Sequence, residues 1–400
     1  MVGGGIAGLA VASELATAGV EVEVVEASPR AGGHIRTERC SGYLCEWGPN
    51  GFLDGATATL DLCDRLGLSP RVIAATDEAN RRFIVRDGKL RELASALTVR
   101  GRVRALAGSL IPMRRSHDDE SVSAFAERKL GREAARVLID AAVTGIWAGD
   151  PRKLSMPSAL PELMQGRITR GRLASFPGGL EELPVALAAS LGPRLRFGAR
   201  VASVSDLDAD AIVLACPAWS AAPLLSTVNP ELSTLLSAIP SVAVAVVHLG
   251  FAAEDAPGLR GFGFLVPSGE DASVLGVLLP SNIFPNRAPD GHLLATVMLG
   301  GARDPGAVQA SDETLFESAS SALRRFAAVT AAPRFALAIR HERAIPQYVV
   351  GHAARLAAID AELRRHPRLF LAGNSYRGVS INACIAEGPS IAARVAARLR

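Results

Sequence analysis

The chain has 400 residues and a net charge of +3; 49% of its residues are hydrophobic and 21% are charged. This balance is typical of a globular protein, so it excludes a disordered or low-complexity chain, and the small net charge gives no support for nucleic-acid binding. No run approaches the about 18 consecutive apolar residues of a membrane-spanning helix, and the longest apolar stretch, 242–253, is predicted to be a buried strand.

A glycine-rich turn that opens a helix comes first. Residues 3–8 read Gly-Gly-Gly-Ile-Ala-Gly, a GxGxxG pattern, and apolar residues continue at helical spacing until Gly19 ends the helix. Gly3 permits the tight turn, Gly5 lets a diphosphate approach the backbone, and Gly8 allows close packing of the helix on a strand. The helix N-terminus offers free N–H groups and partial positive charge to the phosphates.

A β-rich run over 20–25 follows and ends at Glu26, whose carboxylate can bind both ribose hydroxyls of an adenosine. That contact favours FAD or NAD over NADP. Only Met1 and Val2 precede Gly3, whereas the first strand of such a unit has about five residues. We expect a short central strand, with lower stability and weaker cofactor binding as a result; a start further upstream would explain it. Because Met1 leads directly into glycines, we expect no signal peptide.

The next segment favours FAD over NAD. After Glu26 and Ala27, the glycine pair Gly32-Gly33 resembles the FAD-binding segment of the amine-oxidase-like flavoprotein superfamily, in which the pair lets the chain pass close to the flavin diphosphate. The common pattern there has arginine directly after the glycines, whereas this chain has His34. The turn Gly48-Pro49-Asn50-Gly51 resembles the one that passes close to the isoalloxazine ring.

A helical segment with a basic stretch lies in the middle of the chain. Residues 91–165 lack strand patterning and contain an amphipathic helical run over 121–139. Within 91–115 there are six arginines and one acid, Glu92. Apolar residues between the arginines suit a helix lying on anionic lipid, although a solvated basic face fits as well. The arginines are Arg91, Arg100, Arg102, Arg104, Arg114 and Arg115, and the apolar residues are Leu93, Leu97, Val99, Val103, Leu106, Leu110 and Ile111.

The C-terminal segment has the pattern of a second βα unit. Residues 368–372 form an apolar strand ending at Gly373, and a helix with Ser380 or Asn382 as its N-cap then runs to the C-terminus. Pointed at a flavin, the positive end of this helix would stabilise the anion that develops at N1/O2 on reduction. The nucleotide-binding domain is therefore discontinuous, and 209–217 supplies another short buried strand.

Residues 372–385 resemble the C-terminal signature of the protoporphyrinogen oxidases and the related bacterial coproporphyrinogen oxidases. Further segments resemble the same family in the same order: 145–150 with 154–156, 175–179, 261–267, 284–289, and 345–348 with 351–352. The resemblance spans nearly the whole chain. Each segment is modestly specific alone, and their joint order carries the identification.

The resemblance implies an α/β fold of three parts. A discontinuous Rossmann-type FAD-binding domain would comprise 1–75, 172–218 and 366–400. A mixed-sheet substrate-binding domain would comprise 76–90 and 219–365, and an α-helical membrane-binding insert 91–171. The residues expected to bind FAD are Gly3, Gly4, Gly5, Ile6, Ala7, Gly8, Glu26, Ala27, Gly33, His34, Gly48, Pro49, Asn50, Gly51, Val201, Val379, Ser380 and Ile381.

The same resemblance implies four substrate-binding residues. Arg82, just before the strand 83–85, matches an arginine that pairs with a propionate, and bidentate pairing suits a carboxylate. Gly149 matches a glycine whose carbonyl faces the pyrrole N–H groups. Leu265 and Phe284 match apolar residues that flank the macrocycle. Some family members carry a second basic residue beside the flavin, where this chain has Asn50.

The family's reaction removes six electrons from a porphyrinogen in three steps. Hydride passes to flavin N5, and oxygen reoxidises the flavin and yields hydrogen peroxide. The flavin carries the redox chemistry, so we expect no catalytic acid or base. The five cysteines form no CxxC pair and the seven histidines no metal-ligand spacing, so we expect reduced thiols, no metal and a cytoplasmic location, with peripheral contact on the inner face of the cell membrane. Ferrochelatase contact and a homodimer stay open.

Several alternatives also stay open. Protoporphyrinogen is favoured as the substrate, with coproporphyrinogen III as the alternative. Amine oxidases share the FAD signatures but typically carry a lysine beside flavin N5, and no lysine follows Lys153. A carotenoid desaturase fits residues 374–378 poorly. A flavin-free scaffold paralogue in haem synthesis is the alternative outside the enzymes.

Overall fold

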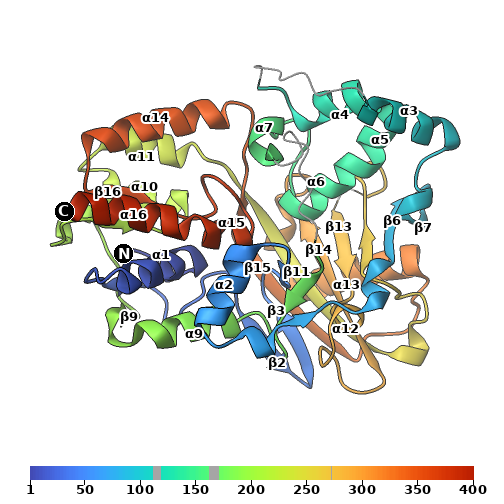
Figure 1. The fold of residues 1–400 in the computed structure, drawn as a ribbon. Coiled ribbons are helices and arrows are strands. Elements are labelled where there is room, and N and C mark those ends of the chain that lie inside the picture. The colour runs from blue at the N-terminus through green and yellow to red at the C-terminus, as the bar shows by residue number, and fades with distance from the viewer. Residues whose placement is uncertain (111–118, 162–170, 272) are drawn as a thin grey trace.

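The computed structural model describes residues 1–110, 119–161, 171–271 and 273–400. Two bodies of structure lie side by side in Figure 1, a sheet covered by helices on both faces and a larger sheet that carries a helical cap. Both chain termini lie in the first body. Ile111, Arg114 and Arg115 of the basic stretch lie outside the described residues, as does the side chain of Leu110.

The first body is built on a parallel sheet. Its strands pair in the order β9 (Leu195–Arg196), β1 (Val24–Val25), Val2, β10 (Ile212–Leu214) and β16 (Leu369–Leu371). Val2 bridges Val25 on one side and Leu214 on the other, and its N–H donates to Val213 O at 2.9 Å. The central strand is therefore short, as expected, but is paired on both sides.

Helices cover both faces of this sheet, because successive side chains of each strand point to opposite faces. Val24, Val213 and Phe370 point to one core, and Ile212 and Leu369 point to the other. The first core is covered by α1 (Ile6–Thr17), α2 (Thr57–Arg65), α9 (Glu182–Leu191), α15 (Ile381–Ala386) and α16 (Gly388–Leu399). The second is covered by α10 (Ala218–Leu225), α11 (Pro230–Ser237) and α14 (His352–Arg365).

The second body is a seven-stranded mixed sheet. Its order is β15 (Phe335–Pro346), β11 (Ser241–Ala252), β14 (His292–Gly300), β13 (Val274–Leu278), β12 (Gly263–Leu265), β6 (Arg82–Arg86) and β7 (Lys89–Glu92). The predicted buried strand is β11. Helix α13 (Asp312–Ala327) packs on one face of the sheet, where Val247 and Val297 are fully buried. The other face, with Val246 and Ile339, packs against Trp47 and Ala148.

Short strands connect the two bodies. The strands β2 (Thr37–Cys40) and β3 (Tyr43–Glu46) form a hairpin that leads into β4 (Phe52–Leu53). Strand β8 (Leu173–Ser175) pairs with β4 on one side and with β5 (Ile73–Ala74) on the other. Helix α12 (Pro280–Ile283) packs beside β14.

A helical segment caps one end of the large sheet (Figure 1). It comprises α3 (Val99–Leu110), α4 (Val122–Leu130), α5 (Arg132–Ala134), a π-helical turn (Ala135–Ile139), α6 (Asp140–Trp147) and α7 (Met156–Ala159). The predicted helix over 121–139 is interrupted at Gly131, whose φ is +91°. Among the described residues, no helix is both long and apolar enough to cross a membrane.

Candidate functional site

The glycines of the amino-terminal turn have three different surroundings. Gly3 has φ +108°, and a Cβ there would lie 2.9 Å from Cys216 N. A Cβ on Gly8 would collide with the carbonyl oxygen of Gly3, so the close contact of helix and strand requires glycine. A Cβ on Gly5 would meet nothing within 4 Å. Gly5 therefore faces free space, where a phosphate group can approach the backbone.

The N-terminus of α1 is free to bind an anion. Gly5 is its N-cap, no side chain caps it, and no acidic residue lies in its first turn. The N–H groups of Ile6, Ala7 and Gly8 precede the first intrahelical bond, in which Leu9 N donates to Gly5 O at 3.0 Å. A diphosphate would satisfy these donors and the partial positive charge of the helix end.

Glu26 is fixed at the end of β1. Its carboxylate accepts the N–H of Gly4 at 2.6 Å through Oε2 and that of Ser28 at 2.7 Å through Oε1. Each carboxylate oxygen can accept a further hydrogen bond, so both can receive ribose hydroxyls. Ala27 follows on the surface. Val201 is half-buried two residues after Ala199, whose N–H donates to Glu26 O at 3.0 Å.

The glycine pair returns to the same turn. Gly32 N donates to Gly4 O at 2.8 Å, and a Cβ on Gly33 would lie 3.3 Å from the Gly5 Cα. The Arg30 guanidinium donates to the carbonyls of Ala31, Gly33 and Ile35, which fixes the loop. His34 is exposed beyond it, with its ring edge-on to His341 at 5.2 Å.

The turn over 48–51 lies directly against His34. A Cβ on Gly48 would lie 2.5 Å from His34 O, and a Cβ on Gly51 would collide with Ala174 O. Pro49 and Asn50 are half-exposed between them. Trp47 lies just before the turn, and its carbonyl oxygen is 2.7 Å from His341 Nε2. The Arg36 guanidinium lies 3.6 Å above its ring.

The C-terminal segment joins this turn through α15. Ser380 is the N-cap, since its Oγ accepts the N–H of Ala383 at 3.1 Å. Asn382 accepts the hydroxyl of Thr59 at 2.7 Å and donates to Leu53 O at 3.1 Å. Leu53 ends β4, the strand that follows Gly51. The half-exposed Val379 and the start of α15 at Ile381 are thereby held beside the 48–51 turn.

The four expected substrate residues lie around α6 and β12. Arg82 is exposed at the start of β6, with its guanidinium 5.0 Å from the Phe262 ring. Leu265 is half-buried on the neighbouring strand, 2.7 Å from the Cβ position of Gly145 in α6. Phe284 is 1% exposed. It packs in an apolar cluster that includes Phe262.

Gly149 lies just beyond the C-terminal end of α6, four residues after Gly145, against which Leu265 packs. Gly149 is buried just after the helix end, where Ala148 has the left-handed conformation. A Cβ at Gly149 would collide with Gln347 Oε1. The structure thus brings Arg82, Leu265 and Phe284 together through Phe262 and β12, and places Gly149 four residues beyond Gly145, against Gln347.

Sequence reasoning missed several side chains that hold these segments. Trp47 and His341 flank the 48–51 turn, and Gln347 and Tyr348 contact the ends of two site segments. Gln347 and Tyr348 lie in a segment that resembles the family, which was the available signal. Tertiary contacts alone bring His341 to Trp47.

Glu46, immediately before Trp47, is a buried acid beside the site. Its carboxylate accepts the N–H of Leu180 and the hydroxyl of Thr37, both at 2.8 Å. Burial raises the pKa of Glu46 to about 7, although these hydrogen bonds and the charge of Arg287 act to lower it. The group therefore titrates near neutral pH.

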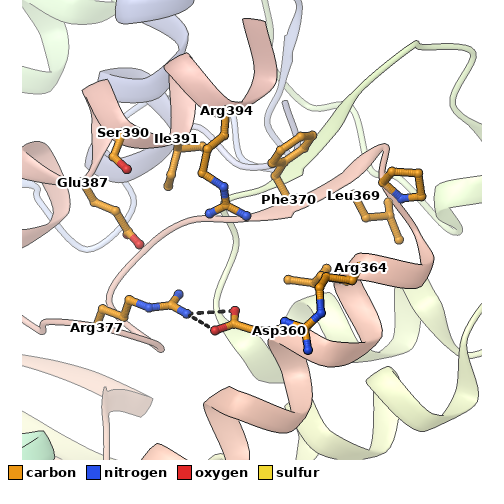
Figure 2. Close-up of a pocket in the computed structure, with 11 residues that line it drawn as sticks. Asp360, Arg364, Leu369, Phe370, Arg377, Glu387, Ser390, Ile391 and Arg394 are labelled. Atoms are coloured by element: carbon orange, nitrogen blue, oxygen red, sulfur yellow. Dashed lines mark hydrogen bonds and ion pairs between the residues drawn. The ribbon is translucent and has the colours of Figure 1, made fainter. Parts of the chain in front are cut away.

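A pocket of about 490 Å³ lies away from the glycine turn, at the edge of β16 between α14 and α16 (Figure 2). Arg377 reaches it from the C-terminal signature segment and binds both carboxylate oxygens of Asp360 at 2.8 Å. The pocket is on the outer side of that segment, so it is distinct from the residues gathered around Gly5.

Known proteins resemble this chain over nearly its whole length. The family model described as flavin containing amine oxidoreductase matches residues 6–396. Protoporphyrinogen oxidase of Homo sapiens is 34% identical, over 99% of this chain and 97% of the relative. Coproporphyrinogen III oxidase of Bacillus subtilis is 26% identical, over 97% and 95%.

Solved structures show the same fold. A protein of Exiguobacterium sp. 255-15, provisionally described as a protoporphyrinogen oxidase, superposes with a TM-score of 0.85 at 23% identity, covering 100% of this chain and 98% of that one. A putrescine oxidase has a TM-score of 0.74 at 17% identity, covering 99% and 98%. The chain belongs to the flavin-containing amine oxidoreductase family, and it is an oxidoreductase whose cofactor is FAD.

Proposed function

We propose that this FAD enzyme oxidises protoporphyrinogen IX to protoporphyrin IX in haem biosynthesis, with oxygen as acceptor and hydrogen peroxide as second product. The observation that carries the proposal is the 34% identity to the human protoporphyrinogen oxidase over 99% of the chain. Coproporphyrinogen III is the second candidate substrate because the Bacillus subtilis relative is 26% identical over 97% of the chain.

The residues around Gly5 would hold the cofactor. The open face of Gly5 and the uncapped N-terminus of α1 favour the diphosphate, and Glu26 favours the adenosine ribose. Gly33 and His34 would flank the diphosphate. The 48–51 turn and residues 379–381 would flank the isoalloxazine. When bound, FAD accepts two electrons in each of three steps and passes them to oxygen.

The substrate would lie beside α6, near Arg82 and Leu265. Arg82 is exposed and free of any ion pair among the described residues, so it can bind a propionate. Leu265, which is half-buried, would contact the macrocycle. Phe284 would shape the site through Phe262, because it is itself buried. Pyrrole protons can leave to solvent, so no side chain is assigned as acid or base.

Helix α3 supports membrane contact by the segment 91–171. Among its described side chains the buried residues are Gly101 and Gly108, while Val99, Val103 and Leu106 are 69%, 63% and 64% exposed at a spacing of one helical face. Exposed arginines flank this face, whereas Leu97 is buried. Large apolar residues outside and small ones inside suit a helix on a lipid surface.

Vesicle co-sedimentation tests that contact. The protein should bind vesicles containing phosphatidylglycerol more than neutral phosphatidylcholine vesicles, and Val103→Gln/Leu106→Gln should reduce binding about tenfold. Val185→Gln, at a 56% exposed residue of α9, is the matched control. Equal binding by all three proteins would refute a role for α3.

Porphyrin fluorescence tests the reaction. The FAD-loaded protein should convert protoporphyrinogen IX with a higher kcat/KM than coproporphyrinogen III, and one hydrogen peroxide should form for each electron pair. A higher kcat/KM for coproporphyrinogen III would favour the second candidate. If yellow, FAD-loaded protein oxidised neither substrate, the proposal would be wrong.

A further inference from the structure

Gln347 and Tyr348, which follow β15, lie between two segments that the proposed function places in the active site. One is the turn at the end of α6, with Trp147, Ala148 and Gly149. The other is the loop 374–380, which leads to the flavin-side residues. Neither Gln347 nor Tyr348 has a role in the proposed chemistry, yet both are buried.

Gln347 holds the turn at the end of α6. Its Nε2 donates to Trp147 O at 2.8 Å and to Ile345 O at 3.2 Å. Its Oε1 occupies the space that a side chain on Gly149 would need. The position of the Gly149 carbonyl, which the proposed function directs at the substrate, therefore depends on this amide.

Tyr348 holds the loop from the inside. Its hydroxyl donates to Asn374 O at 2.7 Å and accepts the N–H of Gly378 at 2.8 Å, so it joins two points of the loop that are four residues apart. Burial raises the pKa of the hydroxyl, which keeps it protonated and able to donate. The Trp147 ring lies edge-on to the Tyr348 ring at 4.9 Å.

His352 also contacts the loop and the Tyr348 ring. It stacks on Tyr348 at 4.1 Å with an interplanar angle of 9°, and its Nε2 lies 2.8 Å from Tyr376 O. Tyr348 and His352 thus hold three backbone groups of the loop. On the outside, the loop has the Arg377–Asp360 pair in the open pocket of Figure 2. Both partners are more than 40% exposed, so this pair contributes little.

We propose that Gln347 and Tyr348 are positioning residues that couple the substrate-side turn at Gly149 to the flavin-side loop 374–380. The inference rests on the proposed function, which assigns Gly149 to the substrate and residues 379–381 to the flavin. Two adjacent, buried, hydrogen-bonded side chains on one short segment fix both at once. Because such coupling is reciprocal, bound porphyrin should tighten FAD binding by the factor by which FAD tightens porphyrin binding.

A matched pair of tyrosines tests the flavin side. Tyr348→Phe removes a hydroxyl with two partners, whereas Tyr376→Phe, in the same loop, removes a buried hydroxyl with no hydrogen-bond partner among the described residues. Tyr348→Phe should weaken FAD binding about tenfold. It should also change the visible circular dichroism of bound flavin and lower kcat. Tyr376→Phe should leave all three unchanged.

Gln347→Met tests the substrate side, since methionine keeps the length but cannot donate to Trp147 O. It should raise KM about tenfold while the FAD dissociation constant and visible circular dichroism stay at wild-type values. In both Gln347→Met and Tyr348→Phe, the factor by which protoporphyrin IX tightens FAD binding should fall toward one. A role in stability alone would lower the Tm and leave this factor unchanged.

The outcomes separate the two proposals. If the wild type oxidises porphyrinogen but Tyr348→Phe matches Tyr376→Phe in FAD affinity, dichroism and kcat, the positioning role is wrong. The same holds if Gln347→Met keeps the wild-type coupling factor, a measurement that stands even where Tyr348→Phe fails to fold. If the wild type binds FAD but oxidises no porphyrinogen, the proposed function fails, and the dichroism of Tyr348→Phe still decides the flavin side.

Discussion

The cofactor side and the substrate side of the site differ in the groups that form them. Around Gly5 the contacts come from backbone: glycines with no room for a Cβ, free helix N–H groups and carbonyls held by Arg30. Around α6 and β12 they come from side chains such as Leu265, Phe262 and Gln347. The backbone-built site tolerates no added atom at Gly3 or Gly8, whereas a side-chain site can lose one contact and keep its shape.

The largest expected effect is on the backbone side, at Gly8. Gly8→Ala should destabilise the protein by about 3 kcal/mol or more, because the new Cβ meets the carbonyl of Gly3, which cannot move without breaking the turn. Chemical denaturation of the FAD-free protein measures it. Gly269→Ala is the control, because Gly269 is exposed, has no positive φ and has nothing within 4 Å of a Cβ. Equal losses for the two variants would contradict the packing role of Gly8.

Gly5→Val separates binding from folding on the same turn. Its Cβ meets no protein atom within 4 Å, so the FAD-free protein should keep its Tm. The valine side chain would occupy the space proposed for the diphosphate, so the purified protein should be colourless. A variant that retained full flavin absorbance would place the diphosphate elsewhere.

Glu46 gives the cofactor side a pH dependence. Its folded-state pKa of about 7 lies above the unfolded value of 4.5, so the folded protein binds the proton more tightly. Stability from this group is complete below pH 4.5 and is lost as the pH rises toward 7, by about 2 kcal/mol between pH 5 and 7. Glu46→Gln should flatten Tm over this range. An unchanged Tm profile would mean that Glu46 stays ionised in the fold.

Arg82→Ala tests the substrate side and should be the mildest change to the molecule. The guanidinium is exposed and makes only a ring contact with Phe262, so stability should change by less than about 0.5 kcal/mol. Loss of a charged hydrogen bond to propionate should lower kcat/KM. The loss of transition-state stabilisation should be about 2 kcal/mol, with full flavin retained. Arg81→Ala, one residue earlier, is the control. If both variants kept wild-type kcat/KM, Arg82 would not bind the substrate.

Local patterns were sufficient for much of the fold. The helix after Gly5, the strand β1 ending before Glu26, and the buried strands β10, β11 and β16 all follow from glycine placement and apolar runs. Where the sequence left two residues open as the N-cap of α15, the hydrogen bonds of the structure decided between them. Ser380 caps α15, while Asn382 instead cross-links it to Thr59 and Leu53. The helix predicted over 121–139 breaks at Gly131, because that glycine takes a positive φ against Arg104.

The sequence by itself determined the glycine turn, the acidic end of the second strand and the family, because each depends on steric or chemical demands within a few neighbouring residues. Only the tertiary structure decided that Phe284 is buried, that His341 reaches Trp47, and that Gln347 and Tyr348 link two segments some 200 and 30 residues away along the chain. These contacts depend on how the two sheets pack, and no local sequence pattern encodes contacts between residues so far apart in the chain.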